Sequence, residues 1–316
     1  MKAFQEHKAT TRTYKLAELY GKENVNQERE TKEVPATKLA RKARSRYSKQ
    51  WQKDVEKEWK EQKRAAPFYQ ELNKEYIDKE RSLEWLRKGV LKFDQERVII
   101  AAQDQGLMTR AFMKMAKLTA DDKCRFCKEE RESSSHLLSS CKILLADRYY
   151  TERHNKLCRY LHWTICKEYG ITVSDKVWQH QPSPLTGNEQ ISIYYDKVMP
   201  TSSYIEEQAV KPDIVVWNRE QKTAKIIEVS VPNDLGLNYS ERKKMKKYLP
   251  LAEDLKRSWS LHTQPDIIPV IVGTTGLMKK NITELVDLIP GRPSTLELQI
   301  GALLGSVKII KRALAQ

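Results

Sequence analysis

The sequence lacks any long apolar run. Its longest apolar stretches, such as residues 267–273, are far shorter than the ~18 residues that a membrane span needs, so we expect neither a transmembrane protein nor a membrane partner. Residues 1–20 contain no apolar core of a secretory signal, and five cysteines cannot all pair in disulfides, which favours a reducing compartment. No internal repeat or low-complexity tract is present, and 316 residues are enough for two domains.

Positive charge is abundant and unevenly distributed. The net charge is +15, of which residues 1–120 contribute +10, residues 121–170 contribute +2 and residues 171–316 contribute +3. The densest run, residues 38–46, has five cations and no acid, which suits phosphate backbones or nuclear import but also fits a solvated helix face. We therefore expect a nucleic-acid partner and a nuclear location. Nucleic-acid contacts in this run are predicted at Lys38, Arg41, Lys42, Arg44 and Arg46.

The distribution of proline, glycine and aromatic residues predicts four segments. Residues 1–36 are expected to be a disordered basic tail. Residues 37–120 are expected to be a helical basic linker region with long helices, because the first half is nearly free of proline and glycine. Residues 121–170 hold a cysteine cluster followed by a helix, and residues 171–316 are expected to form a separate domain.

The sequence pattern of residues 171–316 predicts a mixed α/β fold. Short β-branched runs broken by Pro and Gly alternate there with amphipathic stretches, whereas residues 181–188 have the composition of a loop. This order predicts a mixed sheet with flanking helices. The expected strands are 191–198, 209–217, 224–232 and 267–273, and the expected helices are 240–259 and 281–289.

The cysteine cluster has the spacing of a metal site. Cys124 and Cys127 are followed by His136 and Cys141 in the pattern C-x2-C-x8-H-x4-C. Three thiolates and one imidazole suit tetrahedral Zn²⁺, and a closed set of four ligands leaves no position for a reactive water. The sequence therefore predicts a CCHC zinc knuckle with a structural or nucleic-acid-docking role. The alternative is four unrelated polar or buried residues.

A second run of potential ligands follows at every fourth position. His154, Cys158, His162 and Cys166 would lie roughly along one side of a helix, beside a parallel apolar stripe. Because of that stripe, we interpret them as packed thiols and satisfied histidines rather than as a second metal site.

Two carboxylates converge in a predicted hairpin. A turn centred between Glu220 and Gln221 places Asp213 opposite Glu228, with Cβ atoms about 5 Å apart. Two carboxylates at one point, in a basic chain, suit a hard divalent ion such as Mg²⁺, which can polarise a phosphodiester and activate water. The alternative makes Asp213 a turn residue after Pro212 and Glu228 a solvated strand position.

A nearby lysine would offset this paired negative charge. On the predicted helix 240–259, Lys244 borders the apolar face beside Tyr248, whereas Lys243 and Lys247 point away from it. Lys244 is thus the lysine best placed to approach the carboxylates. Lys243 and Lys247 are predicted to contact DNA phosphates, although all three could form a solvated face.

Together these motifs resemble the C-terminal region of non-LTR retrotransposon proteins that carry a restriction-like endonuclease. The matching segments span about residues 80 to 290. They are the C-x2-C-x8-H-x4-C knuckle, Ala101-Ala-Gln-Asp-Gln-Gly-Leu-Met-Thr-Arg110, Tyr194-Tyr-Asp196, Lys211-Pro-Asp-Ile-Val-Val216, Ile226-Ile-Glu-Val-Ser-Val-Pro-Asn-Asp234 and Lys244-Met-Lys-Lys-Tyr-Leu-Pro-Leu251.

The resemblance implies a PD-(D/E)XK fold, with Asp213 and Glu228 as the acids that bind Mg²⁺ or Mn²⁺. The lysine usual two residues after the second acid is replaced by Ser230. In these retroelement nucleases the lysine lies on the following helix ahead of a Lys-Tyr pair, which corresponds to Lys244. The implied activity is DNA nicking as in target-primed reverse transcription, with DNA and the element's RNA as partners.

The sequence departs from a full retroelement protein in one large respect. It contains no aromatic-x-Asp-Asp polymerase motif, because Asp121-Asp122 follows Thr119-Ala120. No reverse transcriptase activity is therefore expected. The competing interpretation is a catalytically inactive nucleic-acid-binding protein that keeps the fold of a retrotransposon tail.

Overall fold

The computed structural model describes residues 54, 57, 66–199 and 210–315. The predicted tail 1–36 and the five cations from Lys38 to Arg46 lie outside these residues. The described residues from 66 onward belong to one compact unit. Within them, no helix has the length and apolarity that crossing a membrane requires.

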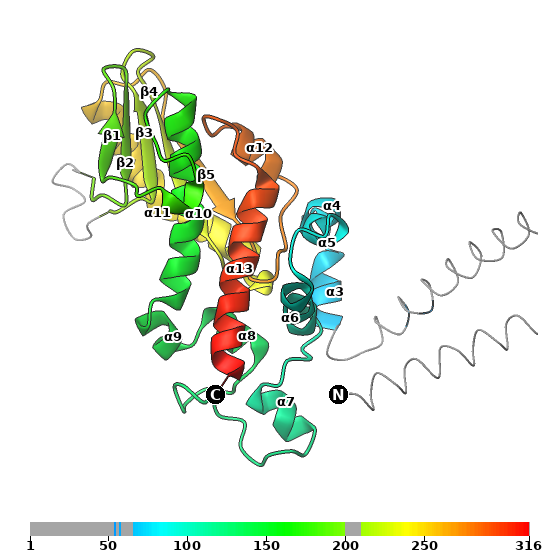
Figure 1. Cartoon of the computed structure of the whole chain (residues 1–316). Helices are drawn as coiled ribbons and strands as arrows, with labels where there is room; N and C mark the ends of the chain where they lie inside the picture. The colour runs from blue at the N-terminus through cyan, green and yellow to red at the C-terminus, as the bar shows by residue number, and fades with distance from the viewer. Residues whose placement is uncertain (1–53, 55–56, 58–65, 200–209, 316) are drawn as a thin grey trace, which may run out of the picture. The chain divides into compact units, whose positions relative to one another are not determined.

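A five-stranded mixed sheet forms the centre of this unit, as the α/β prediction expected. Strands β1 to β4 form an antiparallel meander, and β5 pairs with β4 in parallel after a crossover through helix α11 (Figure 1). The prediction of a loop over 181–188 is wrong in its second half, because the short edge strand β1 lies there. The strands are β1 (Leu185–Gly187), β2 (Ile191–Tyr195), β3 (Ile214–Asn218), β4 (Thr223–Ser230) and β5 (Asp266–Ile271).

The predicted hairpin register is confirmed. Ile214 pairs with Ile227 and Val215 pairs with Ile226 across β3 and β4. Side chains alternate along a strand, so the sheet presents one set of apolar residues to each face. Glu228 is on the same face as Val215 and Ile226.

Helix α11 (Leu237–Ser258) covers that face. Its buried residues pack against Val215 and Ile226, and they are Tyr248, Leu251, Ala252 and Leu255. The predicted helix 240–259 is therefore confirmed, with its start three residues earlier. Because Leu251 is fully buried, Lys244, seven positions earlier, is carried toward the sheet.

Helices α10 (Tyr149–Glu168) and α13 (Thr295–Leu314) cover the other face. They run side by side in Figure 1, and Leu157, Leu161 and Leu298 share one core with Ile214 and Ile227. Helix α12 (Ile282–Asp287) joins the same core, as predicted for 281–289. The sheet is thus the middle of three layers.

Glycine permits the close approach of α13 to α10. A Cβ atom at Gly305 would lie 2.7 Å from the Cβ atom of Arg153, and one at Gly301 would lie 3.1 Å from Leu157. Any larger side chain at Gly305 would therefore displace Arg153. Helix α13 was not predicted.

Several short helices precede the sheet, and between residues 66 and 92, where long helices were expected, the structure has three short ones. Trp85 of α5 and Ile99 of α6 pack against Leu303 and Val307 of α13, so α5 and α6 share a core with it. The helices of this region are α3 (Ala66–Leu72), α4 (Lys79–Ser82), α5 (Glu84–Arg87), α6 (Phe93–Gln103), α7 (Arg110–Met115), α8 (Ser134–Ser139) and α9 (Lys142–Ala146).

Candidate functional site

The four predicted knuckle residues come together as a candidate metal centre. The ligand atoms of Cys124, Cys127, His136 and Cys141 all lie within 4.8 Å of one another, and all four residues are buried. Two of the separations are 3.9 Å, between the sulfurs of Cys124 and Cys141, and 3.5 Å, between Cys127 Sγ and His136 Nε2. Tetrahedral Zn²⁺ sets such separations at about 3.6 to 3.8 Å. This Cys₃His cluster can hold a metal ion and is compatible with zinc.

The electrostatics of the cluster favour a cation. Burial raises the pKa of the Cys124 thiol to about 12 and lowers the pKa of the His136 imidazole. A neutral imidazole is the form that binds metal. Buried thiolates need a nearby positive charge, which a divalent ion supplies. The donor set therefore fits the predicted ion.

The knuckle is fastened to the body of the protein rather than free. The side chain of Arg125, between the first two cysteines, donates to the buried carboxylate of Glu132 at 2.8 Å and to the carbonyl of Ala313 at 2.9 Å. Tyr150 of α10 donates to the carbonyl of Leu137 at 2.8 Å and accepts from the amide of Cys141 at 3.0 Å. The knuckle thus packs on α10 and α13 as part of one core.

Arg153, one turn further along α10, joins the knuckle to the sheet. It is buried, and its guanidinium donates to the carbonyl of Leu138 at 2.9 Å, to the carbonyl of Val231 at 3.2 Å and to Ser306 Oγ at 3.0 Å. Leu138 belongs to the helix that carries His136, whereas Val231 follows directly after β4. One side chain therefore ties three elements together.

Asp213 and Glu228 meet at one end of the β3–β4 hairpin, as predicted. The backbone amide of Asp213 donates to Glu228 Oε1 at 2.9 Å, and the amide of Val229 donates to Asp213 Oδ2 at 2.7 Å. The Glu228 side chain is fully buried and that of Asp213 is 13% exposed. The solvated-position alternative for Glu228 is therefore wrong.

Lys244 is the cation that reaches both carboxylates. Its Nζ atom lies 2.7 Å from Glu228 Oε2 and 3.6 Å from Asp213 Oδ2. Lys243 and Lys247 of the same helix are exposed, and Lys247 donates instead to Tyr248 Oη at 3.0 Å. The structure thus separates Lys244 from its neighbours in the manner that the helical pattern predicted.

The two carboxyl groups titrate differently. Burial, together with the charge of Asp213, raises the pKa of Glu228 to about 7. Burial also acts to raise the pKa of Asp213, but His154 and Lys244 outweigh it and lower that pKa below its usual value. Burial lowers the pKa of Lys244, whereas Asp213 and Glu228 raise it by more, so Lys244 stays cationic at neutral pH. At neutral pH, Asp213 is therefore ionised and Lys244 is cationic, whereas Glu228 can gain or lose its proton.

His154 is the residue of this site that the sequence interpretation missed. Its Nε2 atom lies 3.2 Å from Asp213 Oδ2, and its side chain is 28% exposed, so it is not simply a packed histidine. Burial lowers its pKa, but the Cys158 sulfur and the Asp213 carboxylate raise it by more, so the net shift is upward. The four-residue spacing from His154 to Cys166 places it on one helix side with other potential ligands, but that spacing does not show that Asp213 packs there.

The other half of that run does behave as predicted. His162 is buried, and its Nδ1 atom lies 2.8 Å from Nε2 of buried His180. Burial, assisted by His180, lowers the pKa of His162 to about 4. The two imidazoles are neutral and satisfy each other.

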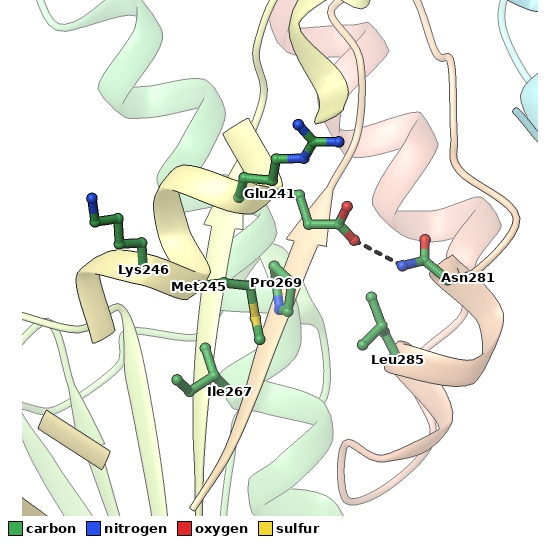
Figure 2. A pocket seen from close by; sticks show the side chains of 8 residues that line it. Glu241, Met245, Lys246, Ile267, Pro269, Asn281 and Leu285 are labelled. Atoms are coloured by element: carbon green, nitrogen blue, oxygen red, sulfur yellow. Dashed lines mark hydrogen bonds between the residues drawn. The ribbon is translucent and has the colours of Figure 1, made fainter. Parts of the chain in front are cut away.

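A groove of about 480 Å³ lies between α11, β5 and α12 (Figure 2). Asn281 Nδ2 donates to Glu241 Oε1 there at 2.7 Å. Its other lining residues are Arg242, Met245, Lys246, Ile267, Pro269 and Leu285. Neither carboxylate of the hairpin lines this groove, so it is separate from the carboxylate site.

Comparisons with known proteins found no family model that matches the chain and no matching curated protein sequence. The two sites above are therefore defined by their geometry. The Cys₃His cluster is shown as a possible metal centre, whereas an ion at Asp213 and Glu228 stays a prediction.

Proposed function

We propose that this protein is a metal-dependent DNA endonuclease, with a restriction-like PD-(D/E)XK domain derived from the tail of a non-LTR retrotransposon protein. One observation carries the proposal: Asp213, Glu228 and Lys244 converge from two strands and a helix, with Lys244 Nζ 2.7 Å from one carboxylate and 3.6 Å from the other. Three charged groups brought together at a nearly dry site are typical of catalytic centres.

Asp213 and Glu228 would hold the ion, which is Mg²⁺ or Mn²⁺ because both donors are carboxylate oxygens. When bound, such an ion supplies Lewis acidity and a more acidic water for phosphodiester hydrolysis. Lys244 is cationic at neutral pH, so its role is to stabilise negative charge that develops on the phosphate rather than to accept a proton. His154 holds Asp213 in place through the 3.2 Å contact.

DNA would be held by exposed cations around this site. Lys243 and Lys247 flank Lys244 on α11, are exposed, and form no ion pair with a described residue. The zinc knuckle would support this surface, since Arg125 and Tyr150 fix it to the same core. The element's RNA is a second candidate ligand, and the nucleus is the proposed location. Polymerase activity is not part of the proposal.

The alternative is a catalytically silent nucleic-acid-binding protein. The observation that favours it is that both carboxylates are already satisfied by protein groups, Glu228 by Lys244 and Asp213 by His154. Both carboxylates therefore have hydrogen-bond partners without an ion.

Nicking of supercoiled DNA by the full chain in Mg²⁺ and in Mn²⁺ tests the proposal. Wild type should nick, Asp213→Ala should not, and both should bind DNA. The matched control is Asp266→Ala, which removes an exposed aspartate of the same sheet that pairs with Lys225 at 2.8 Å. Wild type that binds DNA without nicking it with either ion supports the silent alternative, and wild type that does not bind DNA refutes both.

A further inference from the structure

Three potential ligands of different chemistry converge where α10 meets the hairpin. The ligand atoms of His154, Cys158 and Asp213 all lie within 4.8 Å of one another. His154 Nε2 is 3.2 Å from Asp213 Oδ2 and 3.7 Å from Cys158 Sγ. Cys158 is buried, whereas the side chains of His154 and Asp213 are partly exposed, so solvent reaches two of the three groups.

These separations match a tetrahedral ion. With metal–ligand distances of about 2.3 Å to sulfur and about 2.0 to 2.1 Å to nitrogen and oxygen, neighbouring ligands lie about 3.3 Å apart for nitrogen and oxygen and about 3.6 Å apart for sulfur and nitrogen. The observed values differ from these by about 0.1 Å. The sulfur is also 3.6 Å from His154 Nδ1, so the imidazole would have to turn for Nε2 to point at an ion shared with Cys158.

The donor set selects a different ion from that of the carboxylate pair. Asp213 and Glu228 offer only oxygen, which hard cations prefer, whereas a thiolate and an imidazole prefer Zn²⁺ and similar borderline cations. Asp213 belongs to both sets. An ion held by His154 and Cys158 would therefore take a carboxylate away from the other set.

We propose that His154, Cys158 and Asp213 form a second transition-metal site, which takes Zn²⁺ or Co²⁺ and competes with Mg²⁺ for Asp213. On binding, the Cys158 thiol and the Nε2–H group of His154 each release a proton to solvent, and the freed sulfur and nitrogen coordinate the ion in place of the contact between His154 and Asp213. Three protein ligands leave a fourth position for water. Zinc beyond the equivalent in the knuckle would thus inhibit cleavage, and this last step alone rests on the proposed nuclease function.

Cobalt absorption tests the site without reference to activity. The full chain with its knuckle zinc-loaded is titrated with Co²⁺, and the sulfur-to-cobalt charge-transfer band is recorded. Wild type should bind one further equivalent with this band, and Cys158→Ala should lose the band. Cys166→Ala is the matched control, because Cys166 is a buried thiol on the same helix with its sulfur 3.5 Å from His162 instead.

The result that overturns the site is a wild type without the band, or a Cys158→Ala variant that keeps it. Bound zinc at one equivalent shows that each variant is folded. Should Cys158→Ala fail that check, Cys158→Ser keeps the volume while offering no sulfur, and it should lose the band as well.

Inhibition by zinc tests the competition. Added Zn²⁺ should inhibit Mg²⁺-dependent nicking, with each variant compared with its own rate in Mg²⁺ alone. The half-inhibiting zinc concentration should rise by at least about 10-fold in Cys158→Ala and stay unchanged in Cys166→Ala. Equal zinc sensitivity of the two variants overturns the competition. Absence of nicking in wild type refutes the nuclease proposal while the cobalt result stands, so the two failures are distinguishable.

Discussion

Replacing Lys244 with alanine removes the one described cation that reaches both hairpin carboxylates. At 2.7 Å from Glu228, its attraction to a unit negative charge is about 6 kcal/mol at an effective dielectric constant of about 20. A phosphate oxygen that gains charge at a similar distance would experience a similar attraction. If desolvation offsets roughly half of it, about 3 kcal/mol remains, which is a rate factor of about 10². We therefore expect Lys244→Ala to reduce the single-turnover nicking rate by about 10²-fold or more.

Lys243→Ala is the matched control, because Lys243 is exposed one position away and lies over the Tyr239 ring rather than near a carboxylate. Lys243→Ala should weaken DNA binding modestly and leave nicking at saturating protein nearly intact. Lys244→Ala should show the reverse pattern. Removing Lys244 also leaves Glu228 buried beside Asp213, so folding must be verified by zinc content and urea unfolding. If the two folded variants nick alike, Lys244 is only a phosphate contact and its catalytic assignment is withdrawn.

Three further predictions concern zinc, pH and salt. Purified protein should hold about one equivalent of Zn²⁺ and Cys127→Ser should release it, as metal analysis can check; a zinc-free wild type refutes the knuckle. Without Mg²⁺, folded Glu228 keeps its proton up to about pH 7 whereas the unfolded chain loses it near 4.5, so the free energy of unfolding should fall by at most about 3 kcal/mol across that range. In Glu228→Gln, the free energy of unfolding measured in urea should not fall in this way. If wild type and Glu228→Gln show the same pH dependence, the prediction is wrong. DNA affinity should fall steeply with salt, and replacing both Lys243 and Lys247 should make the logarithmic slope about 2 less negative if each contacts a phosphate; an affinity flat in salt excludes both proposed functions.

The local parts of the site could be predicted from the sequence. The knuckle spacing fixed which four residues meet, since the cluster closes over 18 residues from Cys124 to Cys141. The hairpin turn determined the pairing of Ile214 with Ile227, and hence the approach of Asp213 to Glu228. Both features depend on contacts between residues close in sequence, where turn chemistry and side-chain alternation leave few arrangements.

The long-range parts could not be predicted. His154 lies 59 residues from Asp213, and a four-residue periodicity shows that residues share a helix side without showing what packs against it. Two histidines of the same pattern therefore have different partners, since His154 contacts the Asp213 carboxylate and His162 contacts His180. Helix α13 depends on Gly301 and Gly305, which lower helix propensity and stabilise the fold only through the close approach to α10.

The Arg153 contacts make the knuckle and the hairpin a single thermodynamic system. Zinc that binds the folded chain alone stabilises it by RT ln(1 + [Zn]/Kd), which is about 4 kcal/mol at a free zinc concentration of 1,000 Kd. Arg153 donates hydrogen bonds both to Leu138 beside the knuckle and to Val231 beside β4. We therefore expect a chelator that removes zinc from the knuckle to destabilise the end of β4 as well. Amide hydrogen exchange in β4 should therefore follow the zinc occupancy of the knuckle, although none of the four knuckle residues belongs to the sheet.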